Sequence, residues 1–100
     1  MAWYFIVDTY IGNSGRGEYD EYIEAVRPIV ESYGGKYIVR TENILSLNKD
    51  RNPQRSIVIR FEQKKDIEDC FSSSEYLAIA AKRINSVDSR AIIVDGMEVE

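Results

Sequence analysis

The sequence predicts one α+β domain over residues 1–100, and three features of the chain support this prediction. Four segments rich in β-branched and aromatic residues alternate with segments of helical periodicity. Clusters of glycine and serine separate these segments, which is typical of turns and loops. The composition, 44% hydrophobic and 30% charged, is that of a globular chain able to form one core.

The expected elements follow the order β-α-β-β-α-β, which is typical of a ferredoxin-like fold with a four-stranded antiparallel sheet and helices on one face. The second strand is expected in two pieces, and so is the second helix. The predicted segments are strand Trp3–Ile11, loop Gly12–Gly15, helix Glu18–Tyr33, strand Lys36–Arg40 with Ile44–Leu47, strand Ser56–Phe61, helices Lys64–Phe71 and Ser72–Ile84, and strand Arg90–Asp95.

Local signals support the expected helix ends. Gly34 and Gly35 predict a left-handed stop for the first helix. Pro28 falls inside that helix, where it should remove one backbone hydrogen bond and kink the axis. Ser72 and Glu75 have the spacing of a capping box, which predicts where the last helix begins.

Both faces of the predicted sheet carry large apolar side chains, although two helices can cover only one face. In the first strand Trp3, Phe5 and Val7 would lie on one face, and Tyr4 and Ile6 on the other. Ile57, Ile59 and Phe61 would lie opposite Val58 in the third strand, and Ala91 and Ile93 opposite Ile92 and Val94 in the last. Each large side chain left in water forfeits about 1.5–3 kcal/mol. We therefore expect a homodimer that pairs its sheets as an α+β barrel. Long loops or the segment Met97–Glu100 are the alternative cover.

Composition argues against several classes of function. The net charge is −4, and the basic residues are scattered, so we expect no nucleic-acid partner. The chain has no histidine and one cysteine, Cys70, which argues against haem, zinc and iron sites. We expect no cofactor and no metal. The apolar run near the N-terminus is too short for a signal peptide or a membrane span, so we expect no membrane partner and a cytoplasmic location.

Five residues are candidates for a site. Arg55 and Arg83 could bind a carboxylate or enolate oxygen of a small organic anion, because a guanidinium donates two parallel hydrogen bonds. Tyr76 lies two helical turns before Arg83, so both could face one ligand. Asp8 and Tyr10 share a face of the first strand, where a carboxylate could act as general base and a hydroxyl could hold substrate.

Each candidate also has a structural interpretation. Either arginine could pair with an acid such as Asp8, Glu75 or Asp95 to stabilise the fold. The Tyr76 ring could simply pack on the arginine stem. Asp8 and Tyr10 could be a strand-end acid and a rim tyrosine in water.

Over nearly its whole length the chain resembles the bacterial family called domain of unknown function 1330, within the dimeric α+β-barrel superfamily. The resemblance rests on Tyr4–Val7, Tyr19-x-x-Tyr22, Gly34–Tyr37, Asn52–Arg55 before Ile57–Ile59, Ser73–Tyr76, Arg83 and Ile93–Gly96. It implies a ferredoxin-like subunit, a two-sheet barrel and no established activity. The chain departs from the family, which usually has tryptophan at position 51, a Trp-Tyr pair at 70–71 and proline at 74.

Three functions remain open from the sequence. The superfamily includes cofactor-free monooxygenases and lactone isomerases, which suggests a cofactor-independent enzyme acting on a small organic acid or aromatic compound. A non-catalytic small-molecule binding or sensing dimer is the second. A structural dimer that serves a protein partner is the third, and a solid core would favour it.

Overall fold

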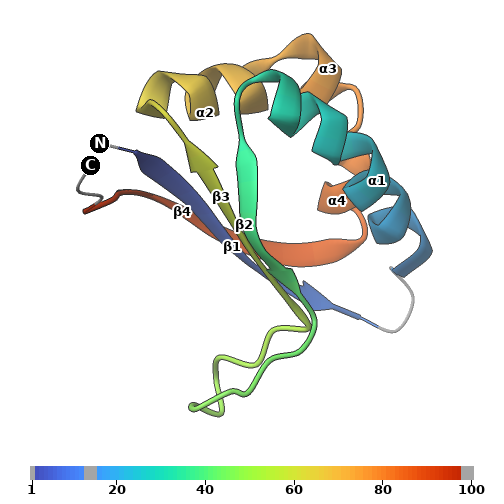
Figure 1. Cartoon of the computed structure of the whole chain (residues 1–100). Helices are drawn as coiled ribbons and strands as arrows, with labels where there is room; N and C mark the ends of the chain where they lie inside the picture. Colours follow the sequence, from blue (N-terminus) through green and yellow to red (C-terminus); the bar gives the residue numbers. More distant parts are fainter. Residues whose placement is uncertain (1, 13–15, 98–100) are drawn as a thin grey trace.

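The structure is a computed structural model that describes residues 2–12 and 16–97, and it confirms the ferredoxin-like fold. Four antiparallel strands form one sheet in the order β2-β3-β1-β4, and the helices lie on one face of it (Figure 1). The elements are β1 Trp3–Ile11, α1 Arg16–Ser32, β2 Lys36–Thr41, β3 Arg55–Phe61, α2 Lys64–Ser72, α3 Ser74–Leu77, α4 Ala80–Ile84 and β4 Val87–Asp95.

β1 lies at the centre of the sheet and matches its predicted bounds. Its neighbours are β3, where Val7 faces Ile57, and β4, where Thr9 faces Ser89. The pairing of β1 with β4 brings the two ends of the described chain together, and the Gly96 amide donates to the Ala2 carbonyl over 2.9 Å. Most of the predicted loop Gly12–Gly15 and the last three residues of Met97–Glu100 fall outside the described residues.

The first helix ends as the two glycines predict. Gly34 has φ of +86°, and the Gly34 and Gly35 amides donate to the carbonyls of Glu31 and Val30. This is the paired arrangement of a Schellman motif, which satisfies carbonyls that the helix itself leaves open. Pro28 lies inside α1 on its exposed side and does not end the helix.

The second helical region differs from the prediction in two details. The N-cap of α3 is Ser73, whose hydroxyl accepts from the Tyr76 amide over 3.1 Å, so the predicted capping box at Ser72 is wrong by one residue. Glu75 instead accepts from the Ser74 and Tyr33 hydroxyls. The expected helix through Ile84 is broken into α3 and α4.

Two strand predictions are also corrected. Ile44–Leu47 is not a strand, because β2 ends at Thr41, β3 begins at Arg55, and residues 44–47 pair with no strand within the described residues. These residues form a loop that extends beyond the end of the sheet (Figure 1). β4 begins at Val87 rather than Arg90, because β1 continues to Ile11 and provides the partner for those three residues.

The core lies between the sheet and the helices. The buried residues of this core include Val7, Tyr19, Tyr22, Ile23, Val26, Val30, Ile57, Ile59, Phe61, Ile67, Cys70 and Tyr76. The opposite face carries no helix, and Ile92 there is 59% exposed. We call this surface the open face. In the described part of the chain, no helix combines the length and apolar character that crossing a bilayer requires.

Candidate functional site

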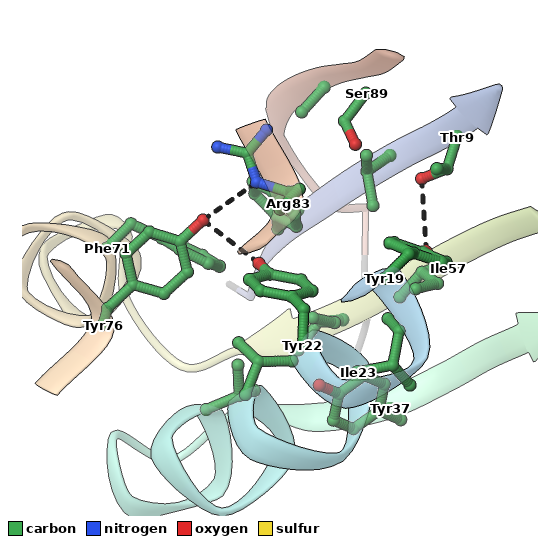
Figure 2. Close-up of a pocket in the computed structure, with 16 residues that line it drawn as sticks. Thr9, Tyr19, Tyr22, Ile23, Tyr37, Ile57, Phe71, Tyr76, Arg83 and Ser89 are labelled. Carbon is green, nitrogen blue, oxygen red and sulfur yellow. Dashed lines mark hydrogen bonds between the residues drawn. The ribbon is translucent and has the colours of Figure 1, made fainter. Parts of the chain in front are cut away.

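A cavity of about 300 Å³ lies between α1 and the helix-covered face of the sheet. We call it the primary cavity. Strands β1, β3 and β4 form its floor, and α1 covers it, with Phe71, Tyr76 and Arg83 at one side (Figure 2). The lining residues are Phe5, Val7, Thr9, Tyr19, Tyr22, Ile23, Val26, Val30, Tyr37, Ile57, Ile59, Phe71, Tyr76, Arg83, Ser89 and Ala91. The walls are therefore apolar and aromatic, with a few polar atoms, as in small-molecule sites.

The polar groups gather at one side of the primary cavity. The Arg83 Nε donates to the Tyr76 hydroxyl over 3.2 Å, and the Tyr22 hydroxyl lies 3.1 Å from that of Tyr76 (Figure 2). The Tyr76 ring packs edge-to-face against Phe71, with ring centroids 4.9 Å apart. The predicted proximity of Tyr76 and Arg83 is thus observed, although the helix expected to carry both is broken between them.

The ionisation of these groups is fixed by their surroundings. Burial, together with the neighbouring Tyr76, raises the pKa of Tyr22 far above its usual range. Burial also raises the pKa of Tyr37 to about 12. Burial opposes the charge of Arg83, but hydrogen bonding to Tyr76 and the nearby Tyr22 raise its pKa overall. At neutral pH the cavity therefore presents protonated phenols and a guanidinium cation.

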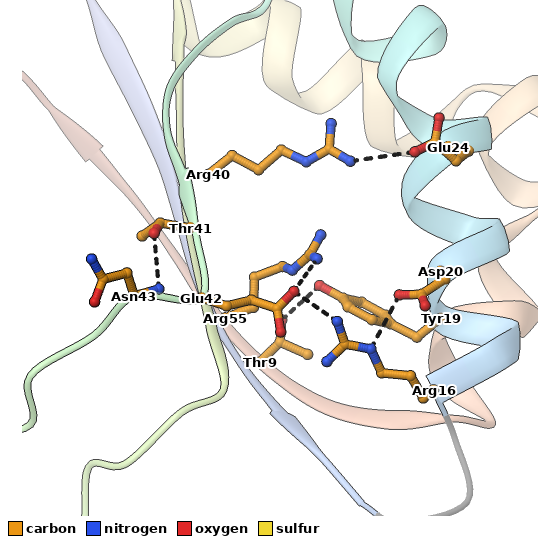
Figure 3. Close-up of polar contacts among 10 residues, drawn as sticks. All are labelled: Thr9, Arg16, Tyr19, Asp20, Glu24, Arg40, Thr41, Glu42, Asn43 and Arg55. Carbon is orange, nitrogen blue, oxygen red and sulfur yellow. Dashed lines mark hydrogen bonds and ion pairs between the residues drawn. The ribbon is translucent and has the colours of Figure 1, made fainter.

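Arg55 lies outside the lining of the primary cavity, in a cluster of ion pairs (Figure 3). Its guanidinium contacts Glu42 over 2.8 Å, and Arg16 contacts the same carboxylate over 2.7 Å. Arg55 also lies over the ring of Tyr19, 5.5 Å from its centroid, and its Nε is buried without a partner among the described residues. Arg55 therefore pairs with Glu42, and not with Asp8, Glu75 or Asp95, the acids expected from the sequence.

Asp8 and Tyr10 share a strand face as expected, but this is the open face. The structure therefore does not bring them together with Arg83 and Tyr76. Asp8 accepts from Arg51 Nε over 2.8 Å and from the Ser56 hydroxyl over 3.3 Å. It lines a second cavity, of about 220 Å³, beneath the loop of residues 42–54. The Tyr10 ring lies under the Arg90 guanidinium, 5.3 Å away.

Sequence reasoning missed Thr9, Tyr22 and Ser89 as cavity residues. Tyr22 belongs to the apolar stripe of α1, a pattern that indicates core packing rather than a ligand site. Ser89 precedes the predicted start of the last strand, so its direction was not assigned. Strand alternation could have found it, because Ser89 lies two residues before the inward-facing Ala91.

A family model matches residues 2–97 of this chain, and its description is domain of unknown function (DUF1330). The chain belongs to the DUF1330 family. This agrees with the resemblance found in the sequence and with the ferredoxin-like sheet. No curated protein sequence matches this DUF1330 chain.

Solved structures share the fold of this DUF1330 chain at low sequence identity. A protein of unknown function from Rhodopseudomonas palustris is 15% identical, with a TM-score of 0.78 over 98% of this chain and 84% of its own. A dimeric ferredoxin-like protein from Jannaschia sp. CCS1 is 10% identical, with a TM-score of 0.79 over 96% and 100%. A cofactor-independent oxygenase from Streptomyces nogalater is 9% identical, with a TM-score of 0.70 over 98% and 95%. These likenesses establish the fold.

Proposed function

We propose that this chain binds a small organic acid or aromatic compound in the primary cavity and acts on it as a cofactor-independent enzyme of isomerase or monooxygenase type. The observation that carries the proposal is the cavity itself. Its volume of about 300 Å³ and its apolar lining with a few polar groups are typical of small-molecule sites. These properties support a role in holding a ligand.

The chemistry of the cavity agrees with such a ligand. Tyr22, Tyr37 and Phe71 supply aromatic walls, while Arg83 and Tyr76 supply a cation and a hydroxyl. Aromatic and aliphatic surface favours an apolar ligand body, and the guanidinium favours an anionic oxygen. The oxygenase from Streptomyces nogalater shares the fold, which makes chemistry without a cofactor a reasonable analogy, and fold analogy is its only warrant.

One observation favours the second candidate, a non-catalytic binding or sensing protein. No carboxylate or imidazole lines the primary cavity in the described part of the chain, so it offers no side chain of the usual general-base type. Asp8, the base proposed from the sequence, lies on the open face. The third candidate, a structural dimer for a protein partner, is disfavoured because the core is not solid.

The experiment is a fragment screen by thermal shift and NMR, using aromatic and branched aliphatic acids, with products analysed by mass spectrometry. Ile23→Phe should fill the primary cavity and abolish ligand-induced stabilisation, because Ile23 lies in its wall. The same substitution at Ile84, which is exposed on α4, should leave binding unchanged. Turnover of a bound compound would establish the enzyme, whereas binding without turnover would establish the second candidate.

We further propose that the chain works as a homodimer paired through the open face. The apolar character of that face and the dimeric protein from Jannaschia sp. CCS1 support this proposal. A cytoplasmic location, and the absence of metal, cofactor and nucleic acid from the function, stay predictions.

A further inference from the structure

Ser89 is an unusual member of the primary cavity. Its Oγ is buried and has no hydrogen-bond partner among the described residues. Ser89 lines the cavity from β4, beside Thr9 of β1, and its hydroxyl points into the space (Figure 2). A buried hydroxyl without a partner is unfavourable for folding, and such groups call for an explanation. A ligand atom that accepts from Ser89 would supply one.

The hydrogen-bonded pair of Tyr22 and Tyr76 also has one hydroxyl proton that is not donated to either oxygen of the pair. The Tyr22 and Tyr76 hydroxyls carry two protons, and only one of these can lie between the two oxygens. Arg83 donates to the Tyr76 oxygen and so uses none of these protons. Whichever tyrosine donates to the other, one hydroxyl proton lacks an acceptor within the described residues. It is therefore available to a molecule in the cavity.

Among the described residues that line the cavity, Arg83 alone has a charged side chain. The titratable lining residues are Arg83 from α4, Tyr19 and Tyr22 from α1, Tyr37 from β2 and Tyr76 from α3. Burial raises the pKa of Tyr19, Tyr22 and Tyr37, so these phenols stay neutral at neutral pH. The guanidinium of Arg83 has five N–H donors, and the Tyr76 hydroxyl accepts from one of them. The polar side of the cavity thus combines unused donors with a positive charge.

We propose that the primary cavity selects the anionic form of its ligand, with a carboxylate, phenolate or enolate oxygen accepting hydrogen bonds from Ser89 and Arg83. This inference rests on the proposed function and specifies its ligand class. The apolar remainder of the ligand fills the space between α1 and the sheet. Because the oxyanion is favoured over its conjugate acid, binding shifts the ionisation of a weak acid toward the anion. Ser89 is the specificity-determining residue, since its hydroxyl has no other partner.

The first test compares benzoate with benzamide, which have the same shape and differ in charge. We expect benzoate to bind at least about tenfold more tightly in calorimetric or NMR titrations, since hydrogen bonds to a charged group are the stronger ones. Ser89→Ala should weaken benzoate binding about tenfold and raise the melting temperature, because it removes an unsatisfied buried hydroxyl. Ser56→Ala is the matched control, since Ser56 is a strand serine whose hydroxyl bonds to Asp8 on the open face.

The second test follows the ionisation of 4-nitrophenol, whose phenolate absorbs visible light. We expect bound 4-nitrophenol to ionise about one pH unit lower than the free probe, the equivalent of a tenfold preference for the anion. Arg83→Met should abolish this shift. Lys82→Met is the charge-matched control, because Lys82 is the neighbouring cation and pairs with Glu21 outside the cavity. If Arg83→Met does not fold, the ionisation of bound 4-nitrophenol is measured in Ser89→Ala instead, and the shift should be smaller there than in the wild type.

The outcomes separate this inference from the proposed function. Equal affinities for benzoate and benzamide would overturn the anion selectivity while leaving ligand binding in place. Binding that is unchanged in a stabilised Ser89→Ala variant would overturn the role of Ser89. If neither compound binds, the inference is overturned for aromatic ligands. The proposed function falls with it only if the fragment screen, branched aliphatic acids included, also finds no ligand.

Discussion

Glu42 joins three parts of the chain through one carboxylate. It follows β2, and it binds Arg16 at the start of α1 and Arg55 at the start of β3 (Figure 3). The two arginines together lower the pKa of Glu42 to about 2, first through hydrogen bonds and then through charge. The cluster also holds Arg55 over Tyr19, which lines the primary cavity. Arg55 thus contacts Tyr19, a residue of the primary cavity, without lining the cavity itself.

This cluster predicts a pH dependence of stability. The pKa of Glu42 is lower in the folded chain than its ordinary 4.5, so its contribution is complete above about pH 4.5 and is lost as the pH falls toward about 2. Because the side chain is 40% exposed, we expect Glu42→Gln to cost less than ~1 kcal/mol at pH 7. Urea unfolding of both proteins between pH 7 and pH 2 measures this difference.

Glu24→Gln is the control for this prediction, because the Glu24 carboxylate is 87% exposed and 3.9 Å from Arg40. Its effect on the free energy of unfolding at pH 7 should be smaller than that of Glu42→Gln. A constant difference between wild type and Glu42→Gln down to pH 2 would contradict the lowered pKa.

The burial of Cys70 leads to a second prediction at the scale of residues, namely low reactivity of its thiol in the folded chain. Its thiol is buried, and burial, with a smaller effect of Glu75, raises its pKa to about 11. At pH 8 only on the order of 0.1% would be thiolate, the reactive form. We expect no labelling of folded protein by iodoacetamide and complete labelling in guanidinium chloride, as measured by intact mass. Rapid labelling of the folded chain would show that α2 does not bury the thiol.

At the scale of elements, the connection between α1 and β2 places the helix on the sheet. Gly34 provides the positive φ, and Gly35 lets the backbone approach closely. A Cβ at Gly35 would lie 2.5 Å from Val30 Cγ1 and 2.9 Å from Phe61 Cζ. Both neighbours belong to the core, so neither can move freely.

We therefore expect Gly35→Ala to destabilise the chain by about 1–3 kcal/mol, as overpacked substitutions do. Gly17→Ala is the matched control, because a Cβ there meets nothing within 4 Å and the residue lies in α1. It should be neutral or stabilise by up to about 1 kcal/mol. Denaturant unfolding gives both values, and equal midpoints for the two variants would contradict the proposed close approach.

At the scale of the whole molecule, the helices cover one face of the sheet and leave the other without a helix. The open face retains exposed apolar residues, and the loop of residues 42–54 adds Leu45 and Leu47, which are 86% and 88% exposed. Large exposed apolar surface on a small domain marks an interaction site. A second copy would cover it symmetrically, since each subunit presents the same surface.

The dimer predicts a particle of twice 11.5 kDa in sedimentation equilibrium. Ile92→Glu should shift the protein toward monomer, because it places a charge on the apolar open face that the dimer would bury. Leu77→Glu is the control, since Leu77 is 61% exposed on the helical layer. A monomeric wild type at micromolar concentration would contradict pairing through the open face.

The sequence predicts a structural feature well when the residues that produce the feature lie close together in the chain. Gly34 and Gly35 act within one turn, and they correctly predicted the end of α1. The helical spacing of Tyr76 and Arg83 predicted their proximity, although the helix between them breaks. The predicted strand Ile44–Leu47 was wrong, because a strand requires a neighbour that local sequence does not reveal.

The sequence by itself determined the order of elements, the two apolar faces of the sheet and the family. Those properties follow from local periodicity and from residue types at short spacing. Only the tertiary structure decided which face the helices cover, and hence that Asp8 and Tyr10 lie away from Arg83 and Tyr76. It also placed Ser89 beside Thr9, because strand register joins residues that are eighty positions apart in the chain.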